Sequence, residues 1–267
     1  MRRYRSLAFA LSAAVAAACD KNGVQNITAP SSGALIKFFN FGVTTPGVTF
    51  YANDQKLTAI SSTICQPPAD TTAMCRTTGN DSTVGTAYGA AGSGGLYNQL
   101  APGQYTLTGK IAAVSANHTT IASASTSLED GKHYSYFISG IYDPVAKRAD
   151  AFVVEDVLPA SDNKIYVRFV NAISNSSPMA LFATPSGGTE VQISAAVPYK
   201  GAGTFVAIGT GGGTLDLTVR TSAGSPVLIT RLGVSFLGGR VYTVTARGDM
   251  VSTVTANKPA LDNTANR

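Results

Sequence analysis

Three short blocks of this sequence occur twice in the same order, and this duplication is the feature that most constrains the fold. The members of each pair share residue types at matched positions, including a basic residue followed by Phe, an apolar residue and Asn in the first pair. The pairs are IKFFNF (36–41) with VRFVNA (167–172), PGQYTLTGK (102–110) with GGTLDLTVR (212–220), and DGKHYSYFISG (130–140) with GGRVYTVTARG (238–248). Ordered internal matches indicate two copies of one structural unit. The alternative is chance similarity between strand-forming segments.

The spacing of the blocks predicts an insertion in the first copy. The first pair is separated by 131 positions, but the second and third pairs are separated by 110 and 108. The first copy therefore carries 21 additional residues between its first two blocks. This interval contains Cys65, Cys75 and the Gly-rich run at 88–95. We expect a long loop at about 60–96, clipped by a Cys65–Cys75 disulfide, because two free thiols are less common in exported proteins.

Both copies are expected to be all-β. Leu215, Leu217 and Val219 alternate with polar residues, which is the two-residue period of a half-buried strand. Turn sequences such as Pro102-Gly103 recur every eight to twelve residues or so, a spacing typical of sandwiches and barrels. We predict two tandem immunoglobulin-like antiparallel β-sandwich domains. The predicted bounds are 34–157 for the first domain, 158–257 for the second and 258–267 for a disordered tail.

The duplicated blocks resemble a bacterial family known as domain of unknown function 4397. The resemblance rests on Phe-(apolar)-Asn near the start of a domain, on LAPGQYTL (100–107) and on Gly-(Lys/Arg)-x-Tyr-(Ser/Thr) about 30 residues later. It covers roughly residues 33–250, although Gly211-Gly212-Gly213 replaces the Ala-Pro-Gly turn in the second copy. The resemblance implies exported β-sandwich domains, often in tandem and often lipid-anchored. It implies no activity and no catalytic residues.

The N-terminus predicts export. Residues 1–18, MRRYRSLAFALSAAVAAA, have a basic start and an apolar stretch of twelve residues. A transmembrane helix needs about 20 residues, so this segment is expected to be a signal peptide rather than a membrane span. A buried helix of the mature fold is the alternative.

Cys19 follows the signal peptide directly, and we expect it to carry a lipid. Ala16-Ala17-Ala18-Cys19 resembles the bacterial lipobox, with Ala in place of the usual Leu three residues before the cysteine. Lipidation also accounts for the odd cysteine if the other two are paired. Two or more acyl chains anchor a protein stably. Residues 19–33 would then be a polar tether, and ordinary cleavage without a lipid is the alternative.

A search of the sequence for chemistry predicts neither a catalytic site nor a cofactor. The two histidines, His118 and His133, have no partner at metal-ligand spacing. One set of polar residues near the junction of the copies is a candidate calcium site because calcium takes six to eight oxygen ligands. Its members are Glu155, Asp156, Asp162 and Asn163. A solvated linker is the alternative interpretation.

The predicted role is therefore a non-catalytic binding, adhesion or assembly module of the cell envelope. Loss of Arg2, Arg3 and Arg5 with the signal lowers the net charge from +5 to +2, so nucleic acid is not an expected partner. The expected partners are the membrane, through lipidated Cys19, and a surface protein or glycan. We expect the outer membrane or cell surface rather than the inner membrane. The alternatives are a soluble periplasmic or secreted carbohydrate-binding protein, an uncharacterised envelope enzyme and a purely structural spacer.

Overall fold

The computed structural model describes residues 32–58, 62–66, 74–78, 85–112 and 118–267. The predicted signal peptide, Cys19 and almost all of the tether lie outside these residues. Contacts divide the chain into Met1–Ser32 and Gly33–Arg267, and all of the described strands lie in the second unit. Within the described residues, no helix is both long enough and apolar enough to cross a membrane.

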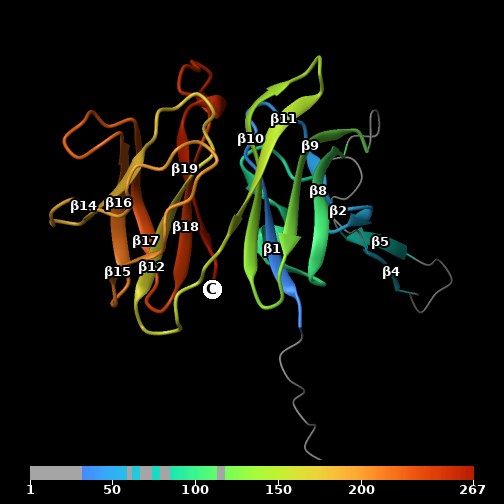
Figure 1. Ribbon diagram of the computed structural model, residues 1–267, viewed down its shortest axis with the longest axis horizontal. Helices are drawn as coiled ribbons and strands as arrows, with labels where there is room; N and C mark the ends of the chain where they lie inside the picture. Colours follow the sequence, from blue (N-terminus) through green and yellow to red (C-terminus); the bar gives the residue numbers. More distant parts are fainter. Residues whose placement is uncertain (1–31, 59–61, 67–73, 79–84, 113–117) are drawn as a thin grey trace, which may run out of the picture. The chain divides into compact units, whose positions relative to one another are not determined.

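The fold is almost entirely β, as predicted, and two sheets make up the N-terminal sandwich (Figure 1). One sheet has the order β11-β10-β1-β6, with β7 also paired to β1, and the other has the order β3-β2-β8-β9. Their strands are β1 (Ala34–Asn40), β2 (Val48–Ala52), β3 (Gln55–Lys56), β6 (Ala90–Ala91), β7 (Asn98–Leu100), β8 (Gly103–Ile111), β9 (Thr120–Leu128), β10 (His133–Asp143) and β11 (Arg148–Glu155).

The C-terminal sandwich has the corresponding pairings. Its sheets have the orders β15-β12-β18-β19 and β14-β13-β16-β17. Their strands are β12 (Ile165–Asn171), β13 (Ala180–Pro185), β14 (Val191–Gln192), β15 (Val206–Gly209), β16 (Gly213–Arg220), β17 (Ile229–Phe236), β18 (Val241–Arg247) and β19 (Ala260–Ala265). In each sandwich the first strand runs parallel to one neighbour, β1 to β10 and β12 to β18, whereas wholly antiparallel sheets were expected.

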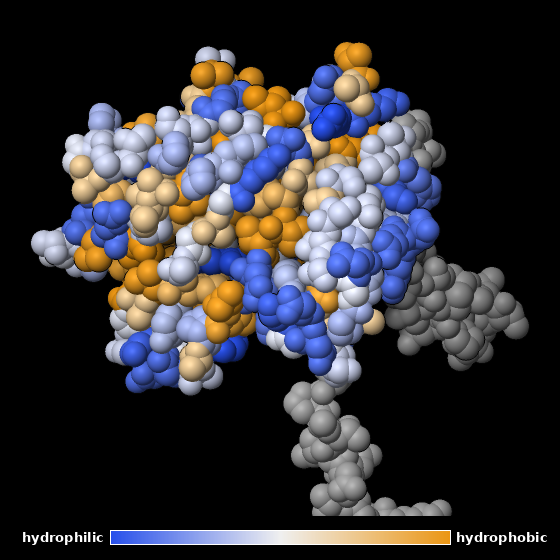
Figure 2. Space-filling model, in the orientation of Figure 1, coloured by the Kyte–Doolittle hydropathy of each residue, from blue (hydrophilic) through white to orange (hydrophobic). Residues whose placement is uncertain are grey.

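Each sandwich encloses its own apolar core. Phe38, Phe50 and Tyr136 fill the first core, with the rings of Phe38 and Phe50 stacked at 5.1 Å. Phe169 and Phe236 belong to the second core. On the face shown in Figure 2, apolar and hydrophilic residues are interspersed over the surface. Each sandwich is therefore organised around a buried core of its own.

The shared Asn of the first block fixes an equivalent loop in both sandwiches. The Asn40 side-chain amide donates to the carbonyl of Thr86 at 2.9 Å, and that of Asn171 donates to the carbonyl of Val197 at 3.2 Å. Both asparagines are fully buried. An unsatisfied buried amide is costly, so this Asn is a structural requirement of the strand end.

Two sequence-based boundaries need correction. Residues 258–267 are not a disordered tail, because β19 pairs with β18 along its length and buries Leu261 in the core. The predicted loop at about 60–96 does not remain a loop to its end, because β6 pairs with β1. In both places the hydrogen-bonding edge of a long central strand recruits a segment whose own sequence pattern is weak.

Within that interval, β4 (Ser62–Gln66) and β5 (Met74–Thr78) form a two-stranded antiparallel ladder. Cys65 and Cys75 are opposite each other in its register. Directly opposed residues have Cα atoms about 4.5–5.5 Å apart, a separation that a disulfide can span. The backbone register is thus compatible with the predicted disulfide, which stays a prediction.

Candidate functional site

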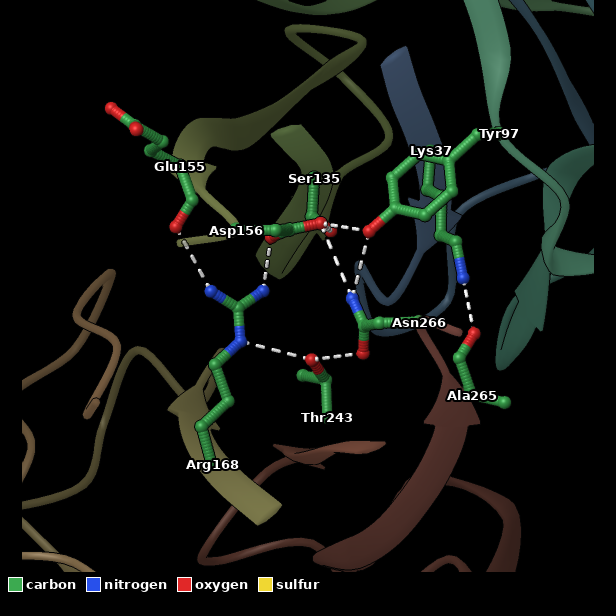
Figure 3. A network of polar contacts seen from close by, with 9 residues as sticks. All are labelled: Lys37, Tyr97, Ser135, Glu155, Asp156, Arg168, Thr243, Ala265 and Asn266. Carbon is green, nitrogen blue, oxygen red and sulfur yellow. Dashed lines mark hydrogen bonds and ion pairs between the residues drawn. The ribbon is translucent and has the colours of Figure 1, made fainter. Parts of the chain in front are cut away.

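A buried polar network joins the two sandwiches and is centred on Asp156, the residue that follows β11 (Figure 3). Its carboxylate forms an ion pair with the Arg168 guanidinium of β12, and the two side chains are 0% and 2% exposed. Arg168 also donates from Nε to the Thr243 hydroxyl at 2.9 Å and from Nη1 to the Glu155 carbonyl at 3.0 Å. A buried guanidinium is tolerated when its charge and its N–H groups are satisfied in this way.

The second carboxylate oxygen of Asp156 collects three further donors. The Tyr97 and Ser135 hydroxyls donate to Oδ2 at 2.6 and 2.9 Å, and the Asn266 amide does so at 3.3 Å. Asn266 also donates to the Tyr97 hydroxyl at 2.9 Å. Both oxygens of this carboxylate are therefore engaged by protein groups, drawn from strands and loops of both sandwiches.

The contacts across this junction are reciprocal. Lys37 of β1 donates to the carbonyl of Ala265, at the end of β19, while Arg168 of β12 donates to that of Glu155, at the end of β11. The registers match as well, since Lys37 is opposite Ser135 and Arg168 is opposite Thr243 in the parallel pairs.

The residues that follow the last strands are equivalent in the same way. The Ser135 hydroxyl donates to the Asp156 carboxylate, and the Thr243 hydroxyl donates to the Asn266 side-chain oxygen at 2.8 Å. The backbone N–H of Asp156 donates to the carbonyl of His133, at the start of β10. That of Asn266 donates to the carbonyl of Val241, at the start of β18. The two sides of the junction thus make matching contacts, with a carboxylate on one side and an amide on the other.

A second pair of equivalent residues extends this relation. Gly89 follows Tyr88, and its backbone N–H donates to the Asn40 carbonyl. Lys200 follows Tyr199, and its backbone N–H donates to the Asn171 carbonyl. Each tyrosine side chain reaches the other sandwich. The Tyr88 ring lies 5.0 Å from the Arg247 guanidinium, and the Tyr199 hydroxyl is 2.9 Å from the Ser139 hydroxyl.

An apolar cluster packs beside the polar network. The Phe137 ring stacks on Phe39 at 4.7 Å and on Phe152 at 5.0 Å, and Val170 of the C-terminal sandwich belongs to the same cluster. These side chains come from the outer faces of the sheets that contain β1 and β12. Both faces of those sheets are therefore buried, one against the sandwich core and one against the junction.

Burial perturbs the titration of three residues in this region. Desolvation lowers the pKa of Lys37 from 10.5 to about 8, although the Asp156 charge opposes the shift. Desolvation raises the pKa of Tyr97, and the Asp156 charge adds to this effect. The ring centroids of His133 and Tyr97 are 5.0 Å apart, and the pKa of His133 is lowered mainly by desolvation. These shifts follow from burial of the charged forms at the junction.

The four residues of the predicted calcium site are directed to separate partners. A residue of a solvated linker would be exposed, but Asp156 is buried against Arg168. The Glu155 carboxylate lies 3.4 Å from the Lys132 ammonium, and Asp162 accepts from the Tyr166 hydroxyl at 2.9 Å. The Asn163 backbone carbonyl accepts from Gly239. Among the residues that the structure describes, no three His, Cys, Asp or Glu side chains form a group that could hold a metal ion.

The sequence contained one signal for this network that was used only to align the repeated blocks. Lys37 and Arg168 interrupt strands that are apolar on both faces, ALIKFFN and IYVRFVN. Continuous apolar runs are typical of strands buried on both faces, so a cation within one needs a buried counter-charge. Asp156 is that counter-charge for Arg168. Tyr97, Thr243 and Asn266 had no comparable signal, because their roles depend on contacts between distant segments.

Comparison with protein families places the chain among domains without an assigned activity. The model of the family described as domain of unknown function (DUF4397) matches residues 34–182. The chain belongs to this family. The matched region covers the N-terminal sandwich, β12 and the first part of β13, and it is shorter than the span of 33–250 expected from the blocks. No curated protein matches the chain.

The geometry of the network points to a structural role. Its charged pair is sealed from solvent, and its hydroxyl and amide groups are committed to one another. General acid–base or nucleophilic catalysis requires groups that can reach a substrate. Arg168 and Asp156 instead fix one sandwich against the other.

Proposed function

We propose that this DUF4397 chain is a non-catalytic module of the bacterial cell envelope that binds or helps to assemble other envelope molecules. The observation that carries this proposal is the burial of the Asp156–Arg168 network between the two sandwiches. The Asp156 and Arg168 side chains hold the two sandwiches together and are buried, so a substrate cannot reach them. A rigid scaffold that presents loops and strand edges suits a binding role.

We further infer that the two sandwiches are tandem immunoglobulin-like copies of one domain. The equal strand orders, the parallel pairs β1–β10 and β12–β18, and the reciprocal contacts of Lys37 and Arg168 support this inference. A two-fold interface between identical units has this reciprocal form. Fusion into one chain allows its centre to become asymmetric, as with Asp156 and Asn266.

The proposal includes a lipid anchor at Cys19, on the outer membrane or the cell surface. A small-residue stretch before the cysteine and a polar segment from residue 20 to Gly33 support it. Each buried CH₂ group contributes about 0.8 kcal/mol to membrane binding, so several acyl chains suffice for a stable anchor.

The experiment is mass spectrometry of the mature N-terminal peptide, taken from membranes of the native host, with protease shaving of intact cells. We expect a di- or triacylated Cys19, and loss of both sandwiches on shaving. A Cys19→Ala variant should leave the membrane fraction. An unmodified N-terminus in the soluble fraction would contradict the anchor and favour a freely diffusing binding protein.

A further inference from the structure

An open cavity of about 470 Å³ lies in the N-terminal sandwich beside the edge strands β9 and β11. Its volume is within the range of ligand-binding sites. The lining comprises the first residues of β9, Thr120–Ser123, the region Ala146–Ala151 that leads into and along β11, and Lys200 of the C-terminal sandwich. Figure 1 shows β9 and β11 as neighbouring strands.

Three cations line this cavity, and two of them stand on a well-defined hairpin. The Asp143 carboxylate accepts the backbone N–H groups of Val145 and Ala146 at 2.8 and 3.0 Å, which shapes the β10–β11 turn. Lys147 has a positive φ of 50° in this turn, and Arg148 begins β11. Figure 2 shows strongly hydrophilic residues near this end of the hairpin.

The positive charge of the cavity is not balanced locally. Among the described lining residues, Asp150 is the single carboxylate, and it is 3.4 Å from the Lys200 ammonium while accepting the Tyr199 hydroxyl at 2.8 Å. Within the described part of the chain, Lys147 and Arg148 have neither an ion pair nor a hydrogen bond from their side chains. Two uncompensated cations in a concave surface create a positive potential that attracts an anionic group.

The walls of the cavity offer unpaired backbone groups. In the described residues, β9 pairs with β8 alone and β11 with β10 alone. The β9 sequence, TIASASTSL, contains neither a charged residue nor a proline. Natural edge strands usually carry such residues as protection against added strands, and β9 has none of them.

In the C-terminal sandwich a side-chain hydrogen bond joins the two corresponding edge strands. Arg231 of β17 donates to the Leu261 carbonyl of β19 at 2.8 Å. Arg231 is opposite Leu217 in the ladder, and the residue opposite the equivalent Leu107 in the N-terminal sandwich is Ala124. Alanine cannot bridge the two edges. Within the described residues, no side-chain hydrogen bond joins β9 to β11 as Arg231 joins β17 to β19, although β9 and β11 lie alongside each other.

We propose that this cavity, defined by Lys147, Arg148 and the start of β9, binds an extended acidic peptide segment of a partner protein. The peptide backbone pairs with β9 over Thr120–Ser123, and a carboxylate lies against Lys147 and Arg148. Strand addition to an exposed edge is an established mode of peptide recognition. This inference rests on the proposed binding role and names the class of partner.

The lining favours a peptide over an acidic glycan. Sugars are commonly held against aromatic rings, and the described lining residues include no aromatic side chain. The Ala122 and Ala149 side chains are buried in the N-terminal core, and the exposed lining residues of β9 are the small polar Thr120 and Ser123. The acidic glycan is therefore an outcome of the test rather than part of the proposal.

The test measures binding to the mature chain carrying Cys19→Ser, which keeps it free of lipid. The probe is a fluorescent peptide of about eight residues with alternating Asp and Thr, measured by fluorescence anisotropy at low salt. Three competitors are used: the Asn/Thr counterpart, the Asp/Thr peptide N-methylated at alternate residues, and polygalacturonate. The variants are Arg148→Glu and, as a matched control of equal charge change on an exposed arginine, Arg240→Glu.

We expect the Asp/Thr peptide to bind and Arg148→Glu to weaken it by about tenfold or more, the effect of one lost charged contact. Arg240→Glu should bind as the parent does, and the Asn/Thr and N-methylated peptides should compete poorly. Equal weakening by both variants, or equal competition by the N-methylated peptide, overturns the proposal. Binding of polygalacturonate without the peptide also overturns it and indicates a glycan site. None of these outcomes bears on acylation of Cys19, so the anchor is judged separately.

Discussion

Lys37 and Arg168 occupy the same position in the first pair of matching blocks. Each donates a hydrogen bond to a backbone carbonyl at the end of the last strand of the other sandwich. The reciprocity breaks at the centre, where only Arg168 meets a carboxylate. Asp156 occupies the position that Asn266 has in the C-terminal sandwich. One buried cation is therefore neutralised by an ion pair, while the other is held by a carbonyl and the Tyr97 ring at 4.3 Å. These two arrangements predict different responses to mutation and pH.

Arg168→Met should destabilise the protein by about 3–5 kcal/mol, because it leaves the Asp156 charge buried without its partner. The measurement is the free energy of unfolding from urea denaturation. Lys164→Met is the control, since its pair with Asp162, at 3.7 Å, is solvent-exposed and should contribute at most about 1 kcal/mol. Equal effects of the two substitutions would show that Arg168 is not a buried charge partner.

Removal of both charges should recover part of this loss. The double variant Asp156→Asn with Arg168→Met has no buried charge at that point, and its network resembles the amide side of the junction. We expect the double variant to be more stable than Arg168→Met alone by at least about 1 kcal/mol. A double variant that is less stable than either single one would contradict the ion-pair account.

Lys37 should make stability depend on pH above neutrality. Burial lowers its pKa to about 8 in the folded protein, from 10.5, so the unfolded chain binds more protons between these values. The contribution of Lys37 to the free energy of unfolding therefore increases as the pH rises from about 8 toward 10.5. The measurement is the free energy of unfolding from urea denaturation between pH 7 and 10. The value for the wild type minus the value for Lys37→Met should increase with pH. A flat difference would show that the ammonium is not desolvated.

Cys65 and Cys75 should resist alkylation until a reductant is added. Their opposed positions on β4 and β5 are the reason for this expectation. Mass spectrometry of the exported protein, treated with iodoacetamide under denaturing conditions, is the measurement. In a Cys65→Ser control, Cys75 should become alkylated without reduction. Labelling of both residues in the untreated wild type would rule the disulfide out.

Leu261→Ala should cost about 2–4 kcal/mol, because Leu261 of β19 is 4% exposed and packs in the C-terminal core. Asn263→Ala on the same strand should change the stability by less than about 1 kcal/mol, since Asn263 is only half-buried. Thermal and urea unfolding measure both. If residues 258–267 were a disordered tail, neither substitution would have an effect.

Local patterns were sufficient where a segment carries its own alternation. A strand was predicted from the alternation of Leu215, Leu217 and Val219 with polar residues, and the chain forms β16, Gly213–Arg220, there. Pattern reasoning was insufficient at β19, whose sequence ALDNTA has a single bulky apolar residue. That segment becomes a strand because β18 presents a free edge to it, and contacts of this kind are not encoded within a short window.

The sequence by itself determined the all-β class and the internal match of the blocks, because side-chain period and turn residues act locally. The tertiary structure alone decided what the acidic residues near the junction do. Asp156 is separated from Arg168 by a loop and from Asn266 by more than 100 residues, yet all three meet in one buried site. A buried charge is stable only among partners that satisfy it, and folding alone brings those partners together.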